Sequence, residues 1–320
     1  MGKGHSVDRD AIDSVLLQPR SRAATLIGYL LLATILLGGS APLAAEVRRA
    51  ISIGISEYPS YPKEEWLQFA DLDAAAFAEA LVWDHAVNVP VKALYAKEAT
   101  REKIWDAVYE LEKGPRPDTL FLFFSGHGEL TAGQKFYLMP FDGDNEHPEV
   151  SAIEFKAVLD YLDEKIGAKN LVIFLDTCHS AAAIRGKGSE PEDATVGSWD
   201  KLISQANAHF SGSINLFASA GAGELSLEDA ENKRGLFTHY LIKGLDGDAD
   251  GINGVKDGQV TAAELKAYLD RDVPPRSLQI GKRPQTPFVN SDYNGELVLA
   301  IPQPWPLRLG PRVQLRGTFR

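Results

Sequence analysis

Apolar runs and segments of helical periodicity alternate along most of the chain. Two runs, 120–124 and 171–175, contain only apolar residues. Such runs are typical of strands buried on both faces of a parallel sheet. Further strands are predicted, the last of them as a late edge strand, at 47–55, 91–95, 214–218 and 297–299.

Segments with apolar residues at helical spacing separate these strands, and they predict helices at 70–82, 100–111, 151–166, 237–245 and 261–273. Thr100 is expected to cap the second helix, and two further helices carry capping-box pairs, Ser151 with Glu154 and Thr261 with Glu264. Strands that alternate with helices predict an α/β domain with a parallel or mostly parallel sheet.

Two segments depart from this pattern. Residues 184–201 hold three glycines, one proline and mixed charges, which predicts a long exposed loop. The end of the chain, 302–320, is rich in Pro and Arg and is expected to be a poorly ordered tail. One domain is therefore expected over 46–301, divided by the loop into 46–183 and 202–301.

The N-terminal segment has the pattern of a targeting signal. Residues 1–22 are polar and end in basic side chains, 23–37 form an uncharged, mostly apolar stretch of 15 residues, and small residues precede Glu46. This order predicts a secretory signal peptide over 1–45, cleaved near Ala45. An uncleaved anchor is the alternative, although a full membrane span needs about 20 apolar residues. Either way the domain is expected to be exported, periplasmic or secreted, with membrane contact only if the segment stays attached.

Composition narrows the classes of function. The 320 residues can bury a large core, and a net charge of -11 argues against a nucleic-acid-binding surface. The single cysteine, Cys178, excludes an intramolecular disulfide and a Cys-rich zinc site. In an oxidising compartment, a lone free thiol indicates a working residue rather than half of a bridge.

Reactive residues follow the two fully apolar runs: Ser125-Gly126-His127-Gly128 after the first, and Asp176-Thr177-Cys178-His179 after the second. Each motif by itself could be a turn or a packed cysteine. Because functional sites of open α/β sheets form at the carboxyl ends of the strands, we expect His127 and Cys178 to meet at one edge.

An imidazole can take the proton of a thiol, which is mostly protonated at neutral pH when its pKa is about 8.5. His179 is a rival base, but adjacent residues of an extended segment point to opposite sides, which favours His127. The glycines beside His127 would let a substrate backbone approach closely. The N–H groups of Gly128 and Cys178 are candidate donors to the oxyanion.

These motifs resemble those of the caspase and metacaspase family of cysteine peptidases. The spacing of 51 residues between His127 and Cys178 agrees with the roughly 50 residues seen in caspases. The resemblance covers roughly 48–301, with weaker matches at 69–74, 216–220, Glu224 and 235–238. It implies a caspase-like three-layer sandwich with a mostly parallel six-stranded sheet, endopeptidase activity through a Cys–His dyad, and no required cofactor.

The resemblance also suggests a substrate preference. Caspases that cut after Asp line their pocket with Arg, but no Arg occurs over 57–82. Asp73, Ser125 and Asp176 stand at positions similar to the metacaspase pocket, which implies protein or peptide substrates cleaved after Arg or Lys. For Asp73 and Asp176, a solvated or turn-stabilising carboxylate is the structural alternative. An inactive binding or scaffold module and an Asp-specific peptidase are the functional alternatives.

Two regulatory features stay open at this point. Arg185 and Lys187 lie in the 184–201 loop, where the family separates its two subunits, so this segment is either a self-cleavage site or an exposed linker. The run Asp246, Asp248 and Asp250 begins like a calcium loop, but its twelfth position is Asp257 rather than Glu. We therefore expect a polar loop there, with calcium as an optional activator on the resemblance alone.

Overall fold

The computed structural model describes residues 46–83, 86–131, 135–179, 199, 210–221, 224–252, 254–291 and 297–302, all within the compact unit Glu46–Arg320. For Trp83, Cys178, His179 and Ser291 it describes the backbone alone. The predicted signal segment, Arg185, Lys187 and the tail beyond 302 lie outside the described residues.

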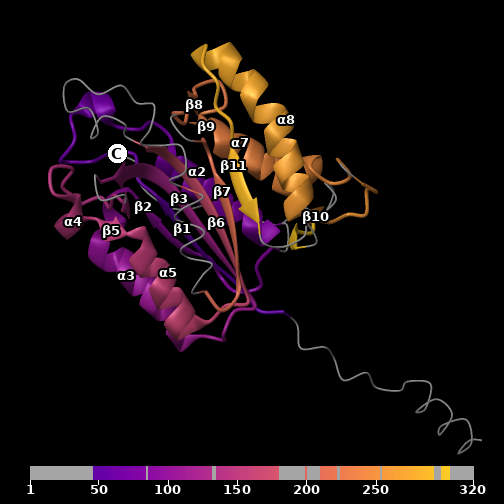
Figure 1. The fold of residues 1–320 in the computed structure, drawn as a ribbon, viewed down its shortest axis with the longest axis horizontal. Helices are drawn as coiled ribbons and strands as arrows, with labels where there is room; N and C mark the ends of the chain where they lie inside the picture. Colours follow the sequence, from indigo (N-terminus) through magenta and orange to yellow (C-terminus); the bar gives the residue numbers. More distant parts are fainter. Residues whose placement is uncertain are drawn as a thin grey trace, which may run out of the picture. The chain divides into compact units, whose positions relative to one another are not determined.

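A mostly parallel sheet forms the centre of this unit (Figure 1). Its main path runs β11-β7-β6-β3-β1-β2, and only the β11–β7 pair is antiparallel. The strands are β1 (Arg48–Gly54), β2 (Lys92–Tyr95), β3 (Thr119–Leu130), β6 (Asn170–His179), β7 (Ser213–Ala218) and β11 (Phe288–Ser291). The predicted α/β class with a mostly parallel central sheet is confirmed, although two short strands beside the six-stranded path bring the described sheet to eight strands.

Helices cover both faces of the sheet (Figure 1). One face packs against α2 (Ala70–Trp83), α7 (Leu236–Lys243) and α8 (Ala262–Gly281), and the other against α3 (Arg101–Tyr109) and α5 (Phe155–Tyr161). Successive side chains of a strand point to opposite faces, so Phe123 of β3 stacks on Phe77 of α2, whereas Phe124 joins the opposite core. The two apolar layers explain why the central strands read as continuous apolar runs.

Short elements complete the fold. The short strands are β4 (Phe136–Leu138), β5 (Ile153–Glu154), β8 (Glu228–Asp229), β9 (Arg234–Gly235), β10 (Val260–Thr261) and β12 (Val298–Ala300). The short helices are α4 (Pro148–Ser151), η2 (Lys63–Glu65), η3 (Ala96–Glu98), η4 (Glu110–Lys113), η5 (Leu162–Ile166) and η6 (Gly244–Asp248). In the part of the chain that the structure describes, no helix is long and apolar enough to cross a membrane.

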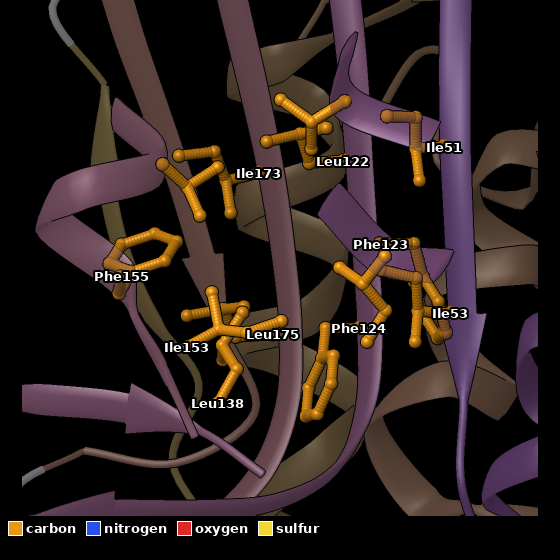
Figure 2. Close-up of a pocket in the computed structure, with 13 residues that line it drawn as sticks. Ile51, Ile53, Leu122, Phe123, Phe124, Leu138, Ile153, Phe155, Ile173 and Leu175 are labelled. Carbon is orange, nitrogen blue, oxygen red and sulfur yellow. The ribbon is translucent and has the colours of Figure 1, made fainter. Parts of the chain in front are cut away.

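Figure 2 shows a pocket between the sheet and the α3–α5 layer. Its lining includes Ile51 and Leu122 from the strands and Phe155 from α5, and every lining residue is apolar. A pocket without polar groups offers nothing to orient or polarise a substrate. We therefore assign it to the packing of the core rather than to function.

The predicted helix 151–166 is wrong at its start, over 151–154, and is confirmed from Phe155 to Ile166. Ser151 ends α4, where its hydroxyl donates to the carbonyls of Asp144 and His147 instead of capping a helix. Residues 153–154 form β5, which pairs with β4, and α5 begins only at Phe155. Pairing with a distant strand has overridden the local capping signal.

Two other boundaries differ from expectation. Helix α8 does not end at residue 273 but continues through Pro274 and Pro275 to Gly281, because Val273 and Ser277 lie buried on its core side. The 297–299 strand pairs with β10 in a separate two-stranded sheet, and β11, which periodicity does not indicate, forms the edge of the main sheet. The expected Thr100 cap and the capping box of Thr261 with Glu264 are confirmed.

Candidate active site

The two reactive motifs lie inside strands rather than after them. β3 continues to Leu130 and β6 to His179, so the turn that was the alternative for the His127 motif does not form. The parallel register pairs His127 with Cys178 and Gly128 with His179. Neighbouring strands lie about 4.8 Å apart, so this pairing places the backbones of the candidate dyad directly beside each other.

The loop that follows β1 surrounds the imidazole of His127. β1 ends at Gly54, which pairs with Ser125, so the part of β3 beyond Ser125 has no β1 partner and the loop lies beside it instead. The ring centroid of Tyr61 lies 4.6 Å from that of His127 at an interplanar angle of 13°, and the centroid of Tyr58 lies 4.7 Å away. The hydroxyl of Tyr58 accepts a 2.8 Å hydrogen bond from the backbone N–H of His127.

A hydrogen bond to the main chain sets the tautomer of His127. Its Nε2 lies 2.8 Å from the carbonyl oxygen of Glu65. Because a carbonyl can only accept, Nε2 carries the proton and the neutral ring keeps its lone pair on Nδ1. Nδ1 is buried, with no hydrogen-bond partner among the described residues.

The surroundings of His127 favour the neutral ring. Its side chain is buried, with 7% of the residue's surface exposed. Burial lowers the pKa of His127 below its ordinary value, and the hydrogen bond to Glu65 opposes this in part. A neutral imidazole with an available nitrogen at neutral pH is what a general base requires.

Packing accounts for the glycines that flank His127. A Cβ at Gly126 would lie 2.4 Å from the hydroxyl of Tyr58, and a Cβ at Gly128 would lie 2.7 Å from the ring of Phe136. Both glycines therefore leave room for neighbouring side chains of the protein itself. This differs from the expectation that they make room for a substrate backbone. The role of Gly128 as an oxyanion donor remains a prediction.

The three predicted pocket residues come together. Asp73 of α2, Ser125 of β3 and Asp176 of β6 line one pocket, and the hydroxyl of Ser125 donates to Asp73 Oδ2 at 3.3 Å. Ser125 and Asp176 are register partners, two positions before His127 and Cys178. One pair of strands thus carries both the candidate dyad and part of the pocket.

Burial and mutual repulsion disfavour the charged forms of the aspartates in this pocket. Burial and the charge of Asp176 raise the pKa of Asp73 to about 8, although N–H donation from Gly235 opposes the rise. Burial also raises the pKa of Asp176, against hydrogen bonds from Ser226 and Thr238. Two buried groups of like charge disfavour ionisation, so a bound cation would stabilise them both.

Sequence reasoning missed two residues that complete the pocket. Glu228 of β8 lines it, while its Oε1 accepts from the N–H groups of Gln68 and Phe69, each at 2.8 Å. Gly235 of β9 lies so close that a Cβ there would stand 2.3 Å from Asp176 Oδ2. Strands of two residues leave no periodic signal, and only the weak family match at 235–238 pointed to this region.

Carboxylates of the acidic loop after α7 accept hydrogen bonds from backbone N–H groups of the same loop. Asp250 accepts from the N–H groups of Asp257 and Gly258, and Asp257 accepts from that of Gln259. Asp248 forms an ion pair with Lys243, and Asp246 lies in η6. Among the described residues, no group of three or more His, Cys, Asp or Glu side chains is arranged to hold a metal. The polar-loop interpretation agrees with this geometry.

Comparison with known proteins identifies the family. The model of the caspase domain of peptidase family C14 matches residues 47–293. The chain therefore belongs to the caspase-domain family of cysteine peptidases, and the fold is the caspase-like sandwich. No curated protein matches the chain.

A solved structure has the same fold. The crystal structure of protein GSU0716 from Geobacter sulfurreducens superposes with a TM-score of 0.53 at 20% sequence identity. The similarity covers 83% of this chain and 97% of that one. At this level of identity the likeness concerns the fold alone.

Proposed function

We propose that this chain is a cysteine endopeptidase in which Cys178 is the nucleophile and His127 the general base and acid. The register pairing of these residues at one end of the β3–β6 ladder is the observation that carries the proposal. The available Nδ1 of His127 and the membership of the chain in a cysteine peptidase family support it.

The chemistry follows from this pairing. Nδ1 takes the thiol proton, and the thiolate attacks the carbonyl carbon of the scissile bond to form a sulfur–carbon bond. The N–H groups of Gly128 and Cys178 stabilise the oxyanion. His127 then gives the proton to the leaving amine as the carbon–nitrogen bond breaks. Water, activated by the same imidazole, hydrolyses the thioester and restores the thiol.

Cleavage after Arg or Lys is the second part of the proposal. Asp73, Ser125 and Asp176 form the primary pocket, and Glu228 adds a third carboxylate. A guanidinium or ammonium bound there would favour the ionised carboxylates and form charge-assisted hydrogen bonds with them. The pocket also contains Arg283, whose charge lowers the net negative potential at its wall.

Further parts of the proposal concern regulation and location. The peptidase is exported, it acts on protein or peptide substrates, and it needs no cofactor. Cleavage at Arg185 or Lys187 would separate the two halves of the domain, as the family pattern implies. Calcium is proposed only as an optional activator, acting through acidic groups other than those of the 246–257 loop.

A panel of fluorogenic peptides ending in Arg, Lys or Asp tests the proposal on the wild-type chain and on Cys178→Ala, with and without calcium. We expect hydrolysis after Arg and Lys that disappears in Cys178→Ala. Preference for Asp would contradict the proposal that Asp73, Ser125 and Asp176 bind a basic side chain. No hydrolysis of any peptide, together with a thiol inert to alkylating agents, would favour the scaffold alternative.

A further inference from the structure

The imidazole of His127 has an aromatic neighbour that the proposed dyad does not explain. Tyr61 lies nearly parallel to the His127 ring, whereas Tyr58 is tilted by 43°. Both tyrosines are buried, and Tyr58 is already engaged by the backbone N–H of His127. Tyr61 is thus the side chain whose ring face is presented to the imidazole.

A carboxylate is linked to the far end of the Tyr61 ring. The hydroxyl of Tyr61 donates to Glu129 Oε1 at 2.9 Å, and both residues are buried. Glu129 stands two positions after His127 on β3, so the strand's alternation gives the two residues the same face. Burial and the negative charge of Glu129 raise the pKa of Tyr61, so the hydroxyl stays protonated and remains a donor.

We propose that Tyr61 and Glu129 act as a positioning pair that holds the His127 imidazole and stabilises its protonated form. The inference rests on the proposed peptidase function, since it concerns the base of that reaction. It adds two residues to which neither the family match nor the sequence assigns a role.

The physical reason is the cost of charging a buried ring. Proton transfer from the thiol makes His127 a cation in a place where burial disfavours one. The face of an aromatic ring attracts a cation, and this attraction is stronger when both are shielded from water. A phenol that donates to a carboxylate has a more electron-rich ring, so Glu129 strengthens the attraction without touching the imidazole.

The other titratable residues near the His127 imidazole make different contacts. Tyr58 accepts from the backbone of His127, and Glu65 offers only its carbonyl oxygen to Nε2. Asp71 acts on Tyr58, whose pKa it helps to raise. Cys178 of β6 is the register partner.

NMR titration of the His127 imidazole tests the pair in the full-length chain, with the resonance assigned by its loss in His127→Gln. We expect Tyr61→Leu to lower the pKa of His127 by about one pH unit, because the cation–π attraction is lost. Tyr61→Phe and Glu129→Gln should lower it by less, since the ring remains but loses its link to the carboxylate. Tyr109→Leu, which removes a stacked tyrosine far from the site, is the matched control and should leave the titration unchanged.

Kinetics supply a second readout. In the Tyr61 and Glu129 variants we expect kcat for an Arg peptide to fall up to about tenfold at similar KM, with the acid limb of the pH profile moved to lower pH. A merely structural role would lower the melting temperature without changing the NMR pKa of His127 or the pH profile of kcat. If Tyr61→Leu does not fold, the Tyr61→Phe and Glu129→Gln titrations decide.

The two proposals fail in different ways. A wild-type pKa for His127 in all folded variants would overturn the positioning pair even if Cys178→Ala abolishes hydrolysis. Hydrolysis that survives in Cys178→Ala would overturn the peptidase proposal, whatever the imidazole titration shows.

Discussion

His127 and Cys178 are register partners in adjacent parallel strands, although 51 residues separate them along the chain. Two positions earlier, Ser125 and Asp176 are partners in the same ladder. A single strand pair thus positions the candidate dyad and part of the acidic pocket at a fixed spacing. Changes to the pocket and changes to the dyad can therefore be separated by experiment.

Because Cys178 is the only cysteine, thiol alkylation measures this residue alone. We expect His127→Gln to slow alkylation at pH 7 by about tenfold or more, since an unassisted thiol is mostly protonated there. Iodoacetamide labelling followed by mass spectrometry gives the rate. His147→Gln, at an exposed histidine on another part of the domain, is the control. Equal rates in wild type and His127→Gln would contradict a working pair.

Asp73→Asn should stabilise the protein while impairing cleavage after Arg. Burial raises the pKa of Asp73 from 3.8 in the unfolded chain to about 8 in the folded protein. The carboxyl therefore contributes its full stability below pH 3.8, and this contribution is lost as the pH rises through 8. We expect the variant to gain about 1–2 kcal/mol at pH 8.5 and little near pH 4. Thermal unfolding at both pH values checks this, with exposed Asp106→Asn as the control. A gain independent of pH would contradict the assignment.

Gly235→Ala should damage the pocket and spare the thiol. The added methyl would lie 2.3 Å from Asp176 Oδ2 and 2.8 Å from Asp73 Oδ2, so the carboxylates must move. We expect kcat/KM for Arg peptides to fall by about tenfold or more, with the rate of Cys178 alkylation retained. Gly254→Ala is the matched control, because nothing lies within 4 Å of its added methyl. Full activity in Gly235→Ala would place substrate recognition elsewhere.

Arg276→Ala should weaken the attachment of the β8–β9 hairpin to α8. Arg276 Nε and Nη2 donate to Asp229 at 2.8 and 3.1 Å, and the Asp229 side chain is 1% exposed. Removing the guanidinium leaves the buried carboxylate without its charged partner, with only the N–H groups of Glu231 and Asn232 still donating to it, which costs roughly 2–4 kcal/mol. Urea unfolding measures the loss. Arg271→Ala, which breaks an exposed pair with Asp272, should cost less than about 1 kcal/mol, and equal losses would refute the argument.

Export of the full chain should yield a mature N-terminus near Glu46. The polar lead, the short apolar stretch and the small residues before Glu46 are the features that a signal peptidase requires. Expression in a bacterial host, fractionation and N-terminal sequencing check this expectation. Retention of Met1 in a membrane fraction would instead support an uncleaved anchor.

The sequence by itself determined the α/β class, the two central strands and the candidate dyad. Fully apolar runs indicate strands buried on both faces, and their alternation with helical segments indicates that helices cover those faces. A unique cysteine and a histidine after such runs then imply a shared edge, because parallel strands end on the same side. These inferences need only local pattern and one rule of sheet geometry.

The tertiary structure alone decided the features that depend on distant partners. The 153–154 segment forms a strand because β4 is beside it, and β11 forms the sheet edge because β7 offers unpaired backbone groups. Glu228 joins the pocket because β8 lies against the start of α2, and Tyr61 faces the imidazole because β1 ends early and its loop turns over β3. Such contacts leave no periodicity in the chain, because each is set by packing between segments far apart in sequence.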